Sequence, residues 1–379
     1  MRFYGKTLIL FTLITILFNS CKNDLKILAP YKEAISVYAI LSPGASEGKG
    51  LSLTTKYYRQ YVRINKIYLG EGNAYDMATV NDSVNYPQGV LDVSLSRTYY
   101  GNFVPTTIGN PTKMQITLKD TVVQLSPGAF NTNQRLWYTD DSLYSDGEYL
   151  LTIKNKLTGN TFTSKAVMIT PIITPGIIQP LGGPYYPVPY NASNPSYYYM
   201  DLSVPNLLRS VKFNTVKNAR DYSCVVRFNY IDSTTSGNIS KSIDYSFTRV
   251  SSTTLDGGEQ LQFSYTAAEF FNYIGSKITE GGDPAGFLAR RLIDIEYIVT
   301  AGAQDFADFI KISAPSTSVA QDKPAYTNID GGYGIFSCNS TFRAPKHLSN
   351  STFDYVASKK PLCSLRFVNS AGNISFTCN

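Results

Sequence analysis

Histidine and closely spaced cysteines, the usual ligands of structural zinc, are almost absent from this chain. Its 379 residues include a single histidine, His347, and no two cysteines stand in a C-x-x-C spacing, so we expect no zinc site. A serine hydrolase would have to use His347 as its base. Residues Gly44–Gly48 match the G-x-S-x-G pattern of such enzymes, but that pattern needs a helix after the serine, and strand-like residues follow here. We expect a hairpin loop there, no enzymatic activity and no cofactor.

Charged residues are also scarce, at 16% of the chain against a usual value of about 25%. The net charge is +6, and basic residues cluster only as the isolated pairs Arg290-Arg291 and Lys359-Lys360. Nucleic-acid-binding domains carry a basic patch, so we expect no nucleic-acid partner. Aromatic residues are plentiful instead, with 29 Tyr and 20 Phe. Such a composition favours strands and predicts a mainly β protein.

Acidic residues are densest at 140–148, where the sequence reads DDSLYSDGE. Calcium prefers several oxygen ligands, and loops of this kind supply them. The spacing does not fit the twelve-residue calcium loop, however. We therefore expect a solvated turn before a strand, and no metal.

Long apolar runs are confined to the N-terminus. Arg2 and Lys6 precede an apolar run at Leu8–Phe18, which is too short for a permanent membrane span, so residues 1–20 predict a secretory signal peptide. The residues LFNSC, ending at Cys21, resemble a bacterial lipoprotein box, whose cysteine is lipidated and becomes the first mature residue. We expect Cys21 to anchor the chain to a membrane and residues 21–33 to form a tether. The alternative is an ordinary cleaved signal with an incidental cysteine.

The rest of the chain predicts two β-rich domains. Period-two alternation and turn signals in residues 34–174 predict a β-sandwich, immunoglobulin-like in general form. Residues 171–198 are rich in proline, which is excluded from sheet interiors, so we place the domain boundary near residue 174. Residues 175–379 predict a second β-rich domain with one or two short helices. Thr266 and Glu269 fit a capping box at the start of the first helix.

The proline-rich segment also predicts a partner surface, because it cannot be an interior strand and carries many tyrosines. The alternative is that these rings pack between the two domains. The candidate residues are Tyr185, Tyr186, Tyr190, Tyr197, Tyr198 and Tyr199.

Four cysteines follow the anchor, and four cysteines allow three pairings. They are Cys224, Cys338, Cys363 and Cys378. The last two are close in sequence, so Cys363–Cys378 is the leading candidate for a disulfide in an oxidising compartment.

Four motifs place an Asp before a hydroxyl residue and then an aliphatic residue or Thr. They resemble the O-glycosylation acceptors of Bacteroidota envelope proteins. The candidate acceptors are Ser83, Thr121, Ser142 and Ser233.

Four stretches, at 35–43, 61–74, 149–159 and 326–336, together resemble an uncharacterised family of Bacteroidota lipoproteins with a domain of unknown function. Such proteins are often encoded beside TonB-dependent receptors. The resemblance implies an outer-membrane lipoprotein facing the cell surface, a β-barrel receptor as partner, and a non-catalytic accessory or ligand-capturing role. Two alternatives stay open. One is a structural subunit of an envelope assembly, such as outer-membrane protein insertion machinery. The other is a glycan-binding adhesin or glycan-acting enzyme.

Overall fold

The computed structural model is mainly β, with 53% of its described residues in strands and 16% in helices, which confirms the expected fold class. Residues 34–68 and 72–379 belong to one compact unit. In the described part of the chain, no helix is long and apolar enough to cross a membrane. The described residues are 33–43, 45–49, 52–56, 59–67, 76, 79–100, 115–124, 133–144, 147–172, 199–314, 326–374 and 378.

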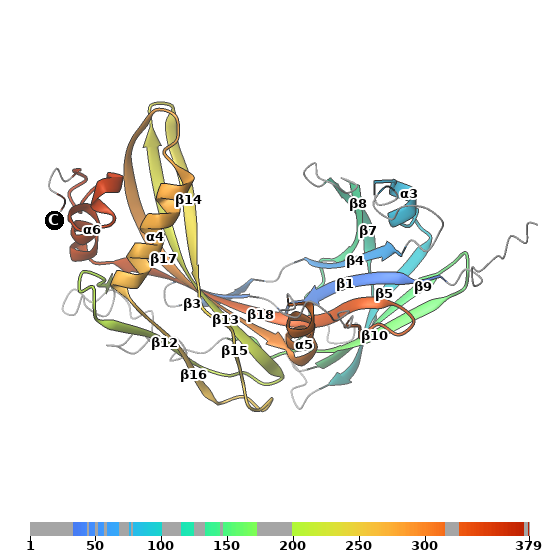
Figure 1. Ribbon diagram of the computed structural model, residues 1–379. Coiled ribbons are helices and arrows are strands. Elements are labelled where there is room, and N and C mark those ends of the chain that lie inside the picture. The colour runs from blue at the N-terminus through green and yellow to red at the C-terminus, as the bar shows by residue number, and fades with distance from the viewer. Residues whose placement is uncertain are drawn as a thin grey trace, which may run out of the picture. The chain divides into compact units, whose positions relative to one another are not determined.

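A twelve-stranded sheet dominates the unit (Figure 1). Its main path is β14 (Gly237–Ser246), β13 (Ala219–Thr234), β17 (Phe287–Ala303), β18 (Tyr333–Leu348), β1 (Ile35–Leu41), β4 (Gln60–Lys66), β8 (Asn133–Thr139) and β7 (Lys119–Gln124). Short strands join this path at its sides: β2 (Ala45–Lys49), β3 (Ser52–Lys56), β11 (Tyr199–Met200) and β15 (Val250–Ser251). Neighbours along the main path are antiparallel, except that β1 and β18 are parallel.

The remaining strands form two smaller sheets. One contains β10 (Thr161–Val167), β9 (Gly147–Asn155), β5 (Leu91–Tyr100) and β6 (Gln115–Thr117), and the other pairs β12 (Leu208–Asn214) with β16 (Gln260–Thr266). Alternate residues of β1, β4, β5 and β9 are fully buried, as expected where two sheets pack face to face. Strands β9 and β10 form a hairpin, and Gly159 has a φ of +76° in its turn.

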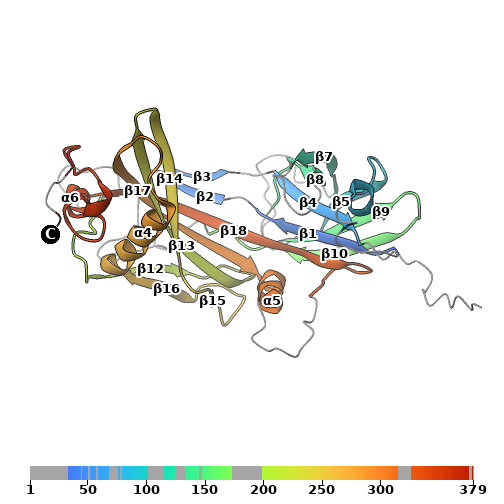
Figure 2. The same ribbon diagram turned by 45° about the horizontal axis from the view of Figure 1, so that its top comes forward.

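The main sheet runs across the domain boundary expected near residue 174. Strand β18 pairs with β17 through its C-terminal part and with β1 through its N-terminal part, from Ser36↔Tyr333 to Leu41↔Cys338 (Figure 2). The Asn328 side chain fixes the backbone of β18 at Phe336. Its amide donates to the Phe336 carbonyl at 2.8 Å and accepts from the Phe336 amide at 2.9 Å. Residues after 326 therefore complete the sheet that residues 35–66 begin.

Helix α4 (Ala267–Gly281) begins where the sequence indicates. The other helices of the described residues are α3 (Asn81–Val84), α5 (Gln304–Ser313) and α6 (Asn350–Ser358), with a 3-10 turn at Cys363–Leu365. The Thr266 hydroxyl accepts from the Glu269 amide at 3.2 Å, and the Glu269 carboxylate accepts from the Thr266 amide at 2.9 Å. The expected capping box is thus confirmed.

Residues Ala45–Lys49, which contain the serine of the G-x-S-x-G match, form strand β2 in a hairpin with β3. The nucleophile elbow of a hydrolase needs a helix after the serine. The backbone here therefore excludes that reading. In the acidic segment 140–148, Asp140 pairs with Arg59 at 2.6 Å. The part of the chain that the structure describes holds no group of three metal-binding side chains.

Candidate functional site

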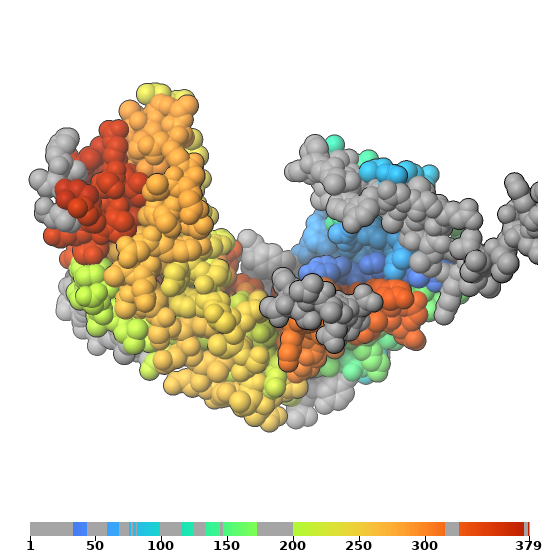
Figure 3. Space-filling view, viewed as in Figure 1, coloured from blue at the N-terminus to red at the C-terminus, as the bar shows by residue number. Residues whose placement is uncertain are grey.

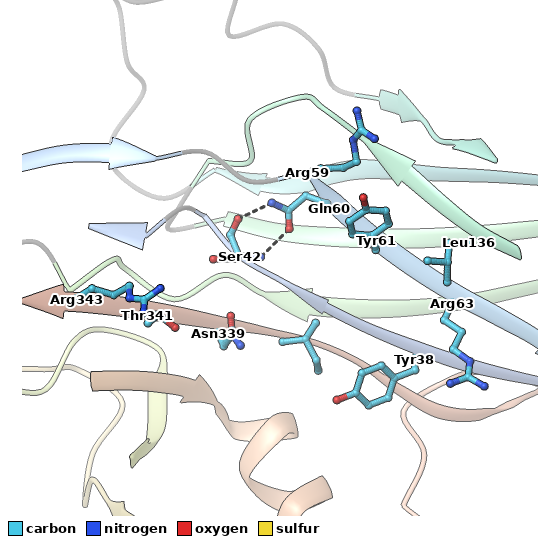
Figure 4. A pocket seen from close by; sticks show the side chains of 11 residues that line it. Tyr38, Ser42, Arg59, Gln60, Tyr61, Arg63, Leu136, Asn339, Thr341 and Arg343 are labelled. Carbon is cyan, nitrogen blue, oxygen red and sulfur yellow. Dashed lines mark hydrogen bonds between the residues drawn. The ribbon is translucent and has the colours of Figure 1, made fainter. Parts of the chain in front are cut away.

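A groove of about 640 Å³ lies on the face of the main sheet where β18, β1, β4 and β8 are neighbours (Figure 4). We call it the sheet-face groove. The blue surface of β1 and β4 beside the orange surface of β18 and α5 is visible in Figure 3. Its lining residues are Tyr38, Ile40, Ser42, Arg59, Gln60, Tyr61, Arg63, Leu136, Asn339, Thr341 and Arg343.

The sequence produces this face by simple alternation. On β1, Val37 and Ala39 are buried while Tyr38 between them is 49% exposed. On β4, Val62 is buried while its neighbour Tyr61 is 43% exposed. Successive side chains of a strand point to opposite faces, so the buried set fills the core and the other set lines the groove.

Strand register brings two rings and a cation together. Tyr38 lies directly opposite Arg63 in the β1–β4 pair, and Tyr61 stands two residues before Arg63 on the same face. Side chains directly opposite each other have Cβ atoms about 4.5–5.5 Å apart. The exposed side chain of Arg63 therefore shares one sheet face with two exposed rings, although its guanidinium turns toward Asn65.

The three arginines of the groove have different partners. Arg59 binds Asp140 through two contacts of 2.6 and 3.3 Å, and this hydrogen bond raises the pKa of Arg59. Arg343 binds the Glu296 carboxylate through contacts of 3.0 and 2.9 Å.

Arg63, in contrast, contacts neutral amides. Its Nε donates to the Asn65 side-chain oxygen at 2.7 Å, and the Gln134 amide lies beside the same guanidinium. Within the described residues, no carboxylate forms an ion pair with it. Its full positive charge is therefore directed at solvent, where an anion can reach it.

Some of the polar groups around the rings make hydrogen bonds within the protein. Gln60 donates to the Ser42 carbonyl at 2.9 Å and accepts from the Ser42 amide at 2.8 Å, which fixes the chain where it leaves β1 (Figure 4). The hydroxyls of Thr341 and Thr300 are 3.1 Å apart. The side-chain amide of Asn339 makes no hydrogen bond within the described part of the chain, so it can both donate to and accept from a ligand.

Helix α5 bounds one end of the groove. The Phe309 ring is 6.1 Å from the Tyr38 ring and 6.1 Å from the Tyr326 ring. Tyr326 donates to Asp305 at 2.8 Å, and burial together with this carboxylate raises the pKa of Tyr326. These contacts hold the Tyr38 ring from one side and leave the other side open.

Farther along the same sheet, polar side chains compensate one another. Arg227 and Asp244 form two hydrogen bonds of 2.7 and 2.9 Å, and this pairing lowers the pKa of Asp244. Asn229 donates to Asp294 at 2.7 Å. These paired polar side chains of β13, β14 and β17 are typical of a solvated sheet face.

Most of the residues singled out from the sequence do not meet at this groove. Cys21 and the five tyrosines at positions 185, 186, 190, 197 and 198 lie outside the described residues. The backbone of Tyr199 lies in β11, paired with His347 of β18. The sequence did not single out Tyr38, Tyr61 or Arg63. Their outward positions in alternating strands were the available signal, but the register that unites them is not local.

The disulfide candidate is present as a bond. Cys363 is joined to Cys378, with Cα atoms 5.4 Å apart. Cys224 and Cys338 are free and buried. Burial raises the pKa of the Cys338 thiol to about 12, so it is protonated at neutral pH and is a poor nucleophile.

The four candidate glycosylation acceptors differ in exposure. Ser142 is exposed, whereas Ser83, Thr121 and Ser233 are half-buried. The Ser233 hydroxyl also donates to Asn238 at 3.0 Å. Of the four, Ser142 therefore has the hydroxyl most open to a modifying enzyme.

No protein-family model matches the chain, and no curated protein matches it.

Proposed function

We propose that the chain is a lipid-anchored outer-membrane lipoprotein on the cell surface that captures a ligand without catalysis and serves a TonB-dependent β-barrel receptor. The signal sequence ending at Cys21 supports the anchor. The resemblance of four stretches to Bacteroidota lipoproteins supports the receptor partner. The sheet-face groove supports the capture role.

One observation carries the proposal: Arg63 has no carboxylate partner in the described chain, and it lies on the same sheet face as the exposed rings of Tyr38, its cross-strand neighbour, and Tyr61. Exposed aromatic rings and arginine are enriched where proteins bind other molecules. Among the described residues that line the groove, none is a carboxylate, histidine, cysteine or lysine. The lining therefore offers contacts that bind and orient a ligand, and its hydroxyl groups have no carboxylate, histidine or lysine of the lining beside them to act as a general base.

Purification of the tagged protein from native membranes after mild cross-linking tests this function. We expect a β-barrel receptor to co-purify with the wild type. A variant with both Tyr38→Ala and Tyr61→Ala should recover at least fivefold less receptor. Tyr333→Ala is the matched control, because Tyr333 is 52% exposed but does not line the groove.

Two results would contradict the proposal. Co-purification of outer-membrane insertion machinery in place of a receptor would indicate a structural subunit. Equal receptor recovery with the double variant and with Tyr333→Ala would show that the groove plays no part.

A further inference from the structure

We infer that the ligand class of the sheet-face groove is an acidic saccharide, whose carboxylate binds Arg63 and whose sugar rings stack on Tyr38 and Tyr61. This inference rests on the proposed capture function and adds the chemistry of the captured molecule. Three features of the groove carry it: its charge, its rings and its unused amide.

The charged residues of the lining are all positive. The lining contains three arginines and no acidic residue. Asp140 and Glu296 compensate Arg59 and Arg343 from outside the lining. Arg63 keeps a net positive charge in the groove, so an anionic group is the complementary ligand. A guanidinium binds a carboxylate through two parallel hydrogen bonds, which makes a carboxylate a better fit than a diffuse negative charge.

Both rings stand on the same sheet face as Arg63, and its guanidinium turns toward Asn65, which leaves the rings uncovered. Tyr38 lies opposite Arg63 on β1, and Tyr61 precedes it on β4. A pyranose ring presents C–H groups on its face, and these pack against the face of an aromatic ring. An acidic sugar with a neighbouring sugar residue would thus place its carboxylate on Arg63 and a pyranose face on each tyrosine.

Asn339 supplies the remaining polar contact. It lines the groove from β18, and its side-chain amide has no hydrogen-bond partner in the described chain. A primary amide both donates and accepts, which suits a pair of neighbouring sugar hydroxyls. The groove therefore offers a contact for each kind of group on an acidic saccharide.

The sheet geometry disfavours the other acidic ligands. Strands β1 and β4 have neighbours on both sides, so their backbone groups are used within the sheet and an extended acidic peptide has no free edge to join. A nucleic acid needs a row of uncompensated cations, and two of the three arginines here are paired.

The test is a binding measurement on the full mature protein, purified from membranes in detergent. The probes are oligosaccharides that contain uronic acid or sialic acid, each compared with its methyl ester as a neutral match. We expect at least one acidic oligosaccharide to bind and its methyl ester to bind at least tenfold more weakly. Raised salt should weaken binding of the acid form.

Variants then locate the site. Arg63→Gln should lower the affinity at least tenfold, and Arg63→Lys should give an intermediate loss because it keeps the charge but not the planar fork. Arg291→Gln is the matched control, since Arg291 is also exposed on the main sheet but does not line the groove. Circular dichroism of each variant checks that the exposed substitutions leave the fold intact.

The outcomes separate this inference from the proposed function. Failure of every acidic saccharide to bind, equal binding of an acid and its ester, or an unchanged affinity in Arg63→Gln would each overturn the inference. Binding of an acidic peptide in their place would also overturn it. If the groove double variant still loses its receptor in any of those cases, the proposed function stands without this ligand class.

Discussion

At the scale of single residues, one buried ion pair links β13 and β17. Asp232 is 0% exposed and Arg290 is 1% exposed. An Asp232 oxygen lies 3.0 Å from Arg290 Nε and another lies 2.8 Å from Lys241 Nζ. Arg290 also donates to the Leu365 carbonyl at 3.0 Å, which ties the C-terminal segment to the sheet. Two charges are thus held where water cannot solvate them, and each depends on the other.

Removing one of these charges should be costly. We expect Asp232→Asn to lower the free energy of unfolding by about 3 kcal/mol, because it leaves Arg290 buried without its full counter-charge. Asp283→Asn is the control: it contacts the same guanidinium at 2.6 Å, but Asp283 is 58% exposed, so water can replace it. Urea unfolding of the two variants measures the difference. Equal losses would show that burial does not govern this cluster.

Lys346 gives a second prediction at this scale, through pH. Burial lowers the pKa of Lys346 from 10.5 to about 8. The folded state therefore favours the neutral amine, and stability is lost as the pH falls from about 10.5 to about 8. Lys346→Met should remove that loss and raise the free energy of unfolding at pH 7 by about 3 kcal/mol. Unfolding curves of both proteins from pH 7 to pH 10.5 test this, and parallel pH profiles would contradict it.

At the scale of elements, the sequence predicted those whose signals are local. The alternation at residues 35–41 matches β1, and the capping box at Thr266 marks the start of α4. Strand β8 (Asn133–Thr139) went unrecognised, because its polar and aromatic residues break simple alternation. Helix α6 (Asn350–Ser358) was also missed, since its apolar stripe is weak. The candidate site was missed for a different reason: Tyr38 and Arg63 meet only through strand register.

The placement of α5 depends on one glycine. A Cβ built on Gly302 would lie 2.4 Å from the Phe306 ring, so the helix packs directly on the strand there. We expect Gly302→Val to displace α5 and to lower the free energy of unfolding by about 2 kcal/mol.

The double variant Gly302→Val with Phe306→Ala provides the control for this contact. If the clash is the cause, the double variant should be less destabilised than the sum of the two single variants. Additive losses would show that Gly302 acts in some other way.

At the scale of the whole molecule, β18 makes one sheet from segments far apart in the chain. Its pairing with β1 is parallel, and parallel partners far apart in sequence leave no local signature. The sequence therefore placed a boundary near residue 174 and could not show that residues 333–338 complete the N-terminal strands. Gly334 permits this pairing: its φ is +108°, and a Cβ there would lie 1.9 Å from the Val37 carbonyl oxygen.

Gly334→Ala should accordingly weaken the whole sheet. We expect the free energy of unfolding to fall by more than about 3 kcal/mol, because the backbone strain and the clash with β1 act together. Gly159→Ala is the matched control, because Gly159 also has a positive φ, of +76°, but nothing lies within 4 Å of its added Cβ. In Gly159→Ala, backbone strain alone should lower the free energy of unfolding, by about 1 kcal/mol.

Two probes decide whether that loss reaches both ends of the sheet. Trp137, the single tryptophan, is buried on β8, so its fluorescence reports the strands beside β4. Far-UV circular dichroism reports all strands, including the long pair β13 and β17. Because β18 joins the two regions, both probes should show one urea transition that Gly334→Ala shifts as a unit. A variant that moves the fluorescence transition alone would instead mean that the two halves unfold independently, as the boundary near residue 174 predicts.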